Sequence, residues 1–126
     1  MDFVENFKDL EVYRVSRELS KRVYEISNEF PKEETYSLTD QIRRSSRSIG
    51  AQIAEAWAKR KYEKHFVSKL TDSNGEQLET QHWIETALDC GYLSKEHAES
   101  LLITCNSIGK MLNSMIIKAT SFCQKF

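Results

Sequence analysis

The sequence predicts an all-α fold, an antiparallel up-down-up-down four-helix bundle that forms a single domain over residues 1–126. One proline and four glycines in 126 residues leave few interruptions for long helices. Apolar residues recur every three or four positions along most of the chain, which is the spacing of one helix face. The segments between these stripes are short, and short connections place consecutive helices antiparallel to each other.

The first helix is predicted over residues 8–29. Pro31 ends it, because a proline disfavours helical backbone at the residue before it. The segment in front of this helix is expected to pack Phe3 and Phe7 against the bundle. The apolar face of the helix is Val12, Leu19, Val23, Ile26 and Phe30.

The second helix is predicted to begin at Ser37 and to end near Ala58. Ser37 and Asp40, three residues apart, have the pattern of a capping box, in which each side chain satisfies a free backbone N–H of the other. The apolar stripe is Leu38, Ile42, Ile49 and Ile53. Small residues fill much of the remainder and would let a neighbouring helix approach closely: Ser45, Ser46, Ser48, Gly50, Ala51, Ala54, Ala56 and Ala58.

The third helix is predicted over residues 62–90, with one face formed by Phe66, Leu70, Ser73, Ile84 and Leu88. Gly75 lies inside it. Because a glycine in a helix interior costs about 1 kcal/mol relative to alanine, we expect a kink or a tight backbone contact there. Gly91 follows the last turn and is expected to end the helix in the left-handed conformation.

The fourth helix is predicted to begin after an N-cap at Ser94. It carries a heptad seam whose apolar residues alternate steps of four and three: Leu101, Cys105, Ile108, Leu112, Met115, Ala119, Phe122 and Phe126. A second stripe lies off this seam: Leu102, Ile103, Ile116 and Ile117. This stripe is either part of a wide core face or a contact between subunits. The apolar C-terminus, with Phe122, Cys123 and Phe126, is expected at a subunit contact.

The charge of the chain is unevenly distributed. Residues 41–69 hold eight Lys and Arg against two Glu, a formal charge of +6, in a chain whose net charge is −1. Such a segment is a candidate nucleic-acid-binding surface on the second helix. The residues that would carry it are Arg43, Arg44, Arg47, Lys59, Arg60 and Lys61. The alternative is that acids of neighbouring helices pair with these arginines: Glu76, Glu79, Glu85 and Asp89.

Little in the sequence points to catalysis or to a metal. His82 lies eight residues before Cys90, about 12 Å along a helix, which is too far for proton transfer. The three cysteines include no closely spaced pair, and the Glu-x-x-His pattern of di-metal bundles is absent. We therefore expect no enzymatic activity, no catalytic residue, no metal and no cofactor. The acidic N-terminal residues and the lack of a long apolar run favour a cytoplasmic protein without a membrane segment.

Several segments, in order and at the right spacing, resemble one bacterial family: FKDLEVY (7–13), FPKEETYSL (30–38), QIRRSSRSIGAQIAEAW (41–57) and SNGEQLETQHWIETALDCGYL (73–93). The chain resembles the four-helix-bundle proteins of intervening sequences in 23S rRNA genes, also labelled S23 ribosomal proteins. The accessory variability determinant of diversity-generating retroelements is similar to this family. Gln52 and Ala56 depart from the family pattern, which commonly has Asn and Gly at these positions.

The resemblance implies an antiparallel bundle that assembles into a ring, typically a pentamer, with no enzymatic activity. It also implies contact with RNA or DNA, and with a protein partner, through basic surfaces. The resemblance also suggests structural ion pairs between the second and third helices. In these pairs Arg43 or Arg44 would reach Glu76 or Glu79. Such a pair would fix the register of two helices more than it would add stability.

Two functions therefore remain open. The chain is either a homo-oligomer that binds nucleic acid through its basic second helix, or a ring-forming structural or protein-interaction module without that affinity. Exposure distinguishes them: the first is favoured if three or more of five side chains lie free on one continuous face, namely Arg43, Arg44, Arg47, Arg60 and Lys61. Interleaved aromatic residues would strengthen it. Trp57 is expected in the core or in an interface.

Overall fold

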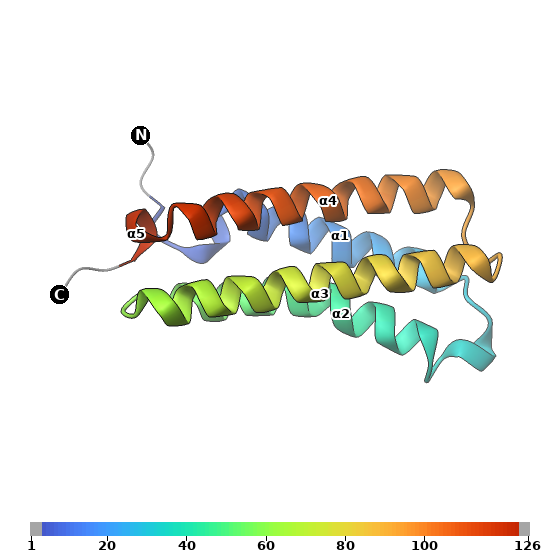
Figure 1. The fold of residues 1–126 in the computed structure, drawn as a ribbon. Helices are drawn as coiled ribbons and strands as arrows, with labels where there is room; N and C mark the ends of the chain where they lie inside the picture. The colour runs from blue at the N-terminus through green and yellow to red at the C-terminus, as the bar shows by residue number, and fades with distance from the viewer. Residues whose placement is uncertain (1–3, 124–126) are drawn as a thin grey trace.

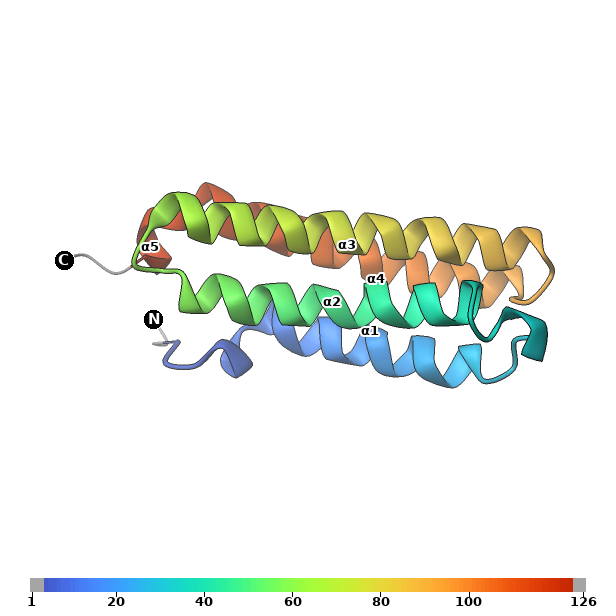
Figure 2. The same ribbon diagram turned by 90° about the horizontal axis from the view of Figure 1, so that it is seen from below.

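The computed structural model describes residues 4–123 and confirms the all-α bundle. Four long helices form it: α1 (Glu11–Ser27), α2 (Leu38–Ala58), α3 (Glu63–Asp89) and α4 (Lys95–Ile117). A short helix, α5 (Ala119–Phe122), follows, and two 3₁₀ turns span Phe7–Asp9 and Lys32–Glu34. Successive long helices run antiparallel, and α1 and α4 also touch, which closes the bundle (Figures 1 and 2).

The core forms along the predicted stripes. Fully buried side chains from the four long helices meet on the bundle axis, among them Leu19, Ile49, Phe66 and Leu112. Burying a large aliphatic or aromatic side chain contributes about 1.5 to 3 kcal/mol, so this axis is the main source of stability. It also fixes which helix faces are left for function.

The start of α1 differs from the prediction. Its N-cap is Leu10, because the preceding residues form a separate 3₁₀ turn. The Asn6 side chain caps that turn by accepting a hydrogen bond from the Lys8 backbone N–H at 3.0 Å. Phe7 packs edge-on against Tyr13, with ring centroids 4.9 Å apart, as the sequence predicted. Phe3 lies outside the described residues.

The predicted capping box at the start of α2 is wrong, although the helix does begin after Ser37. The Ser37 side chain makes no capping hydrogen bond. The first free N–H of the helix, that of Leu38, instead faces the Glu34 carboxylate at 3.5 Å. The acid that serves α2 therefore comes from the turn before the helix rather than from Asp40 inside it.

The glycine prediction in α3 is also wrong. α3 is continuous through Gly75, and a Cβ added there would meet no atom within 4 Å. The close approaches occur at other glycines. A Cβ at Gly50 would lie 3.1 Å from the Ser16 hydroxyl on α1, and one at Gly109 would lie 2.9 Å from the Gln77 amide nitrogen on α3.

Both predicted features of the α3–α4 connection are confirmed. Gly91 has a φ of +76°, a left-handed conformation that glycine adopts without the strain of a side chain. The Ser94 hydroxyl caps α4 by accepting a hydrogen bond from the His97 backbone N–H at 3.1 Å.

The heptad seam of α4 is buried from Leu101 to Met115, but the helix is interrupted at Lys118 before α5. Ala119 is buried, and the Phe122 ring stacks on Phe66 with centroids 6.0 Å apart. Phe122 thus has a packing partner within its own chain, whereas Phe126 lies outside the described residues.

The second stripe of α4 divides. Leu102 and Ile116 pack at the edge of the core, so the wide-core-face interpretation holds for them. It fails for Ile103 and Ile117, which are 69% and 75% exposed. These two isoleucines are two heptads apart and therefore share the outer face of the helix.

A polar contact joins the two central helices α2 and α3. The hydroxyls of Ser45 and Thr80 lie 2.9 Å apart, and the Ser73 hydroxyl donates to the Ile49 carbonyl at 2.9 Å. All three side chains are fully buried and hydrogen-bonded. Their small size lets the two backbones approach closely, as the density of small residues in α2 predicts.

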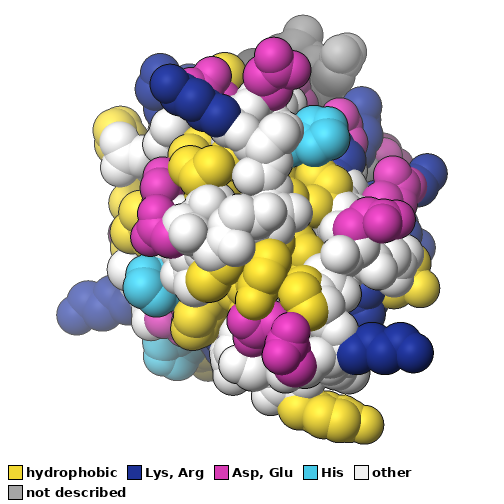
Figure 3. Space-filling view, turned by 90° about the vertical axis from the view of Figure 1, so that its right-hand side faces the viewer, with side chains coloured by type: hydrophobic (Ala, Val, Ile, Leu, Met, Phe, Trp, Pro, Cys, Tyr) yellow, Lys and Arg dark blue, Asp and Glu magenta, His cyan; other side chains and the backbone are white. Residues whose placement is uncertain are grey.

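The two connections at one end of the bundle are tied together. The Tyr92 hydroxyl in the α3–α4 connection donates to the Glu34 carboxylate in the α1–α2 connection at 3.0 Å. The rings of Phe30 and Tyr92 lie 5.7 Å apart beneath this bond. Figure 3 looks onto this end, where hydrophobic side chains show in the centre and Lys and Arg side chains project at the sides.

Candidate nucleic-acid interface

The three neighbouring arginines of α2 point to three different environments. Arg43 turns towards α1, where its Nε donates to the Ser27 hydroxyl at 2.8 Å and its Nη2 to the Asn28 side-chain oxygen at 2.9 Å. Its guanidinium also lies over the Tyr24 ring, 4.6 Å from the centroid. Within the described residues Arg43 makes no ion pair with Glu76 or Glu79.

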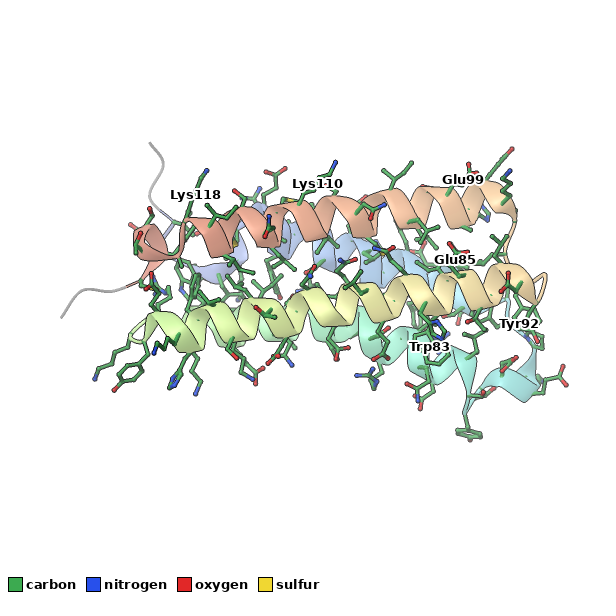
Figure 4. The ribbon with its side chains drawn as sticks, viewed as in Figure 1. Trp83, Glu85, Tyr92, Glu99, Lys110 and Lys118 are labelled. Carbon is green, nitrogen blue, oxygen red and sulfur yellow. The ribbon has the colours of Figure 1, made fainter. Side chains whose placement is uncertain are left out.

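Arg44 turns the other way and reaches both carboxylates of α3. Its Nη1 lies 3.3 Å from a Glu76 oxygen, and its Nη2 contacts Glu79. The Trp83 indole N–H donates to the same Glu79 oxygen at 3.0 Å, from a side chain that points towards α2 (Figure 4). The Trp83 hydrogen bond and the Arg44 charge hold the pKa of Glu79 below its usual value.

This depressed pKa predicts a pH dependence. A carboxyl whose pKa is lowered by folding stabilises the folded state above its unfolded pKa of about 4.3 and loses that contribution as pH falls through the folded pKa. Lowering the pH below about 4.3 should therefore reduce the free energy of unfolding of the wild type more than that of Glu79→Gln, which has no carboxyl to protonate at this position. Chemical unfolding between neutral and acidic pH measures this difference.

Glu85→Gln is the matched control, since this glutamate lies on α3 and points away from α2 (Figure 4). It should follow the wild-type pH profile. If Glu79→Gln also follows the wild-type pH profile, ionisation of Glu79 in its contact with Arg44 and Trp83 does not contribute to stability.

A further basic surface involves α1, outside the charged segment 41–69. Arg17, Lys21 and Tyr24 follow one another at steps of four and three, so they share one face of α1. Together with Arg47 of α2 they line an open groove of about 560 Å³, which Glu18 and Ser20 also line. The helical spacing of the three α1 residues was the signal that could have found them. We call Arg17, Lys21, Tyr24, Arg43 and Arg47 the α1–α2 surface.

A second hollow of about 580 Å³ lies near the start of α2. Arg47 lines both, so the two adjoin at this side chain. We call this second space the Tyr36 hollow, because the Tyr36 ring on its rim is 94% exposed. Its lining is Thr35, Tyr36, Thr39, Asp40, Arg43, Arg44, Arg47, Ser48 and Ala51.

The remaining three candidates lie at the other end of α2. Lys59 is 16 residues after Arg43, roughly 24 Å along a helix axis. Arg60 lies over the Trp57 ring at 3.5 Å and donates to the Trp57 carbonyl at 2.9 Å, and burial lowers its pKa. Lys61 lies 5.7 Å from the Tyr62 ring centroid. Trp57 is half-buried against the core, as expected.

The six sequence candidates therefore form two groups rather than one face. Arg43, Arg44 and Arg60 have hydrogen bonds within the chain, while Arg47 is exposed beside Tyr24 at 5.8 Å. α2 alone does not provide three free cations on one face. α1 adds two exposed cations beside Arg47: Lys21, and Arg17, whose guanidinium also donates to the Tyr13 hydroxyl at 3.2 Å. Tyr24 places an aromatic ring among them.

Other kinds of site find little support in residues 4–123. These residues hold no group of three His, Cys, Asp or Glu side chains that could bind a metal ion. Burial raises the pKa of the Cys105 thiol to about 12, so this cysteine is a core residue rather than a nucleophile. Across the same range, no helix has both the length and the apolar character needed to cross a membrane.

The fold and the surface together define a class: a helical bundle with an ion-paired central helix pair and a basic, aromatic groove on one side. Comparison with known families makes this specific. Residues 8–114 match the model of the 23S rRNA-intervening sequence protein family, so the chain belongs to that family.

A solved structure supports the assignment. It is a protein of unknown function from the S23 ribosomal protein family of Bacteroides thetaiotaomicron. The two sequences are 31% identical, the match covers 83% of this chain and 97% of the other, and the TM-score is 0.75. A comparison with curated proteins gave no match. The expected link to the retroelement accessory protein stays a prediction.

Proposed function

We propose that the chain binds RNA or DNA through the α1–α2 surface, as a cytoplasmic protein without enzymatic activity. The observation that carries this proposal is the contiguous groove in which exposed Arg17, Lys21 and Arg47 surround the half-exposed ring of Tyr24. Nucleic-acid-binding grooves combine cations that contact phosphates with aromatic rings that contact bases or sugars. The family name, which refers to a ribosomal RNA gene, is consistent with this ligand class.

The charge balance of the groove supports a local rather than a global attraction. The chain as a whole is slightly acidic, so distant regions do not attract a polyanion. In the groove the three exposed cations face one acid, Glu18. Arg44, whose charge is matched by Glu76 and Glu79, is not part of the proposed contact set.

Binding to labelled RNA and DNA over a salt series tests the proposal. The variant Arg17→Ala/Lys21→Ala/Arg47→Ala should lose affinity by roughly 10- to 100-fold at low salt, because three exposed charge contacts are removed. The slope of log K against log salt should fall by about 2 to 3, since each lost phosphate contact removes about 0.7 to 0.9.

The matched control is Lys95→Ala/Lys110→Ala/Lys118→Ala, which removes the same charge from α4 and from the residue that follows it. Lys110 and Lys118 point outward from the bundle there (Figure 4). This control should keep both the affinity and the slope. Equal losses in the two variants would mean that only net charge matters, and the proposed surface would then be wrong.

A second function has its own supporting observation. Leu78, Ile103 and Ile117 are large apolar side chains that are each more than half exposed on α3 and α4. Exposed apolar residues of this kind support contact with further copies of the chain or with a protein partner. The arginines would then act inside the chain, as Arg43 and Arg44 do. The pentamer implied by the family resemblance is part of this proposal.

The two functions separate in one set of samples if molecular mass is measured alongside binding. An oligomer that dissociates on Ile103→Lys/Ile117→Lys while its nucleic-acid affinity is retained supports both proposals as independent properties. Absence of nucleic-acid binding at low salt, with the oligomer intact, leaves the interaction module as the function.

A further inference from the structure

We propose that the Tyr36 hollow accepts an unpaired nucleobase, so that the ligand class is single-stranded RNA or DNA rather than a duplex. This inference rests on the proposed function and names its substrate class. It adds a residue, Tyr36, that lies outside the α1–α2 surface but lines the hollow next to it.

The first argument is the exposure of the Tyr36 ring. At 94% exposed, the ring contributes almost nothing to the core of its own chain. Its size alone would favour burial, since aromatic side chains bury 150 to 250 Å² when they pack. An exposed ring that lines the same hollow as the exposed Arg47 offers a stacking surface for a base.

The second argument is that the segment carrying this ring is anchored. Glu34, two residues earlier, accepts hydrogen bonds from the Tyr92 hydroxyl at 3.0 Å and from the Leu38 N–H at 3.5 Å. The Thr35 hydroxyl donates to the Lys32 carbonyl at 2.7 Å, and the Ser37 N–H to the Glu34 carbonyl at 3.0 Å. The backbone on both sides of Tyr36 is therefore held, so less entropy is lost when a base stacks on the ring.

The third argument is the chemistry of the hollow, which matches a whole nucleotide. Arg47 provides an exposed guanidinium group for a phosphate, and Tyr36 provides a face for a base. Asp40 lines the same hollow and would repel a second phosphate. Its carboxylate can instead accept hydrogen bonds from the amino group at a base edge.

Base pairing decides which nucleic acid can use this arrangement. Inside a duplex both faces of each base are covered by the neighbouring base pairs, so the Tyr36 ring has no partner there. A surface that recognised charge alone would favour the duplex, because its phosphates are more densely spaced. A preference for single strands therefore cannot arise from the cations alone.

The test compares binding of wild type, Tyr36→Ala and Tyr36→Phe to RNA and DNA strands of about 16 nucleotides and to the corresponding duplexes, at low salt. Wild type should bind the single strands more tightly. Tyr36→Ala should lower single-strand affinity by a factor of about 5 to 150, the range for loss of one stacked base, and leave duplex affinity unchanged. Tyr36→Phe should keep the single-strand affinity because the ring remains. The separate RNA and DNA arms show which sugar is preferred.

Tyr62→Ala is the matched control, since Tyr62 is also exposed, at 55%, and lies beside Lys61 at the far end of α2. It should behave as wild type. Because Tyr36 has so little contact with its chain, the thermal midpoint of Tyr36→Ala should equal that of the wild type. That measurement separates loss of binding from loss of folding.

The remaining outcomes overturn the inference in distinguishable ways. If wild type binds neither single strands nor duplexes, the proposed function fails and this inference fails with it. If wild type binds duplexes as well as single strands, or Tyr36→Ala lowers both equally, the inference is wrong while the proposed function stands. A change of molecular mass in Tyr36→Ala without a change in affinity would assign the ring to a contact between copies of the chain.

Discussion

Phe66→Ala is expected to lower the free energy of unfolding by about 3 to 5 kcal/mol, the range for a fully buried aromatic residue. Phe66 is 0% exposed and lies near the start of α3, where α5 packs against α3. The loss has two parts. Less apolar surface is buried on folding, and a cavity remains that the rigid helices cannot fill. Urea unfolding followed by circular dichroism measures it.

Phe122→Ala provides the comparison. The Phe122 ring stacks on Phe66 at 6.0 Å but is only half-buried, so the loss should be smaller, about 1 to 2 kcal/mol. The double variant should lose less than the sum, because the two rings share one contact. Strict additivity would mean that α5 does not rest on Phe66 in solution.

Ser45→Leu is expected to cost about 2 to 4 kcal/mol, although leucine is the better helix former. Ser45 is fully buried, and its hydroxyl lies 2.9 Å from that of Thr80 on α3. A leucine at this position adds three carbon atoms between two closely packed backbones and removes the hydroxyl contact. The helices must separate, which disturbs the neighbouring Ser73–Ile49 hydrogen bond as well.

Ser48→Leu makes the same change three residues later on α2, where the side chain borders the Tyr36 hollow. Its hydroxyl bonds only the carbonyl of Arg44 in its own helix, so the stability should change by about 0.5 kcal/mol or less. Thermal and urea unfolding of both variants measure the contrast. Similar losses in the two would mean that the α2–α3 contact tolerates larger residues than the structure indicates.

The bundle could be predicted from the sequence because its determinants are local and periodic. The apolar stripe of α4, the left-handed Gly91 and the Ser94 cap each depend on residues within a few positions of one another. The capping prediction that was wrong depends instead on how the chain runs between helices. The capping box predicted Asp40 as the acid at the start of α2, but the path of the Lys32–Glu34 turn brings Glu34 to the Leu38 N–H instead.

The candidate site was predictable only in part. The basic run of α2 is visible in the sequence, but the sequence does not say that Arg43 and Arg44 point to different helices. The α1–α2 surface exists because Gly50 brings α1 close to α2, a contact between segments more than thirty residues apart. Composition and spacing describe one helix at a time, so a groove made by two helices escapes them.

The tie between Glu34 and Tyr92 has a practical consequence for solution work. Cys90, two residues before Tyr92, is the exposed cysteine of the three, whereas Cys105 is buried and burial raises the pKa of Cys123. A maleimide dye at neutral pH would therefore attach mainly to Cys90 without any engineered thiol. Tyr92 is hydrogen-bonded to Glu34, and Tyr36 lies two residues after Glu34. The dye would therefore be attached to a connection that contacts the segment lining the Tyr36 hollow. Its emission could then follow ligand uptake in a stopped-flow instrument.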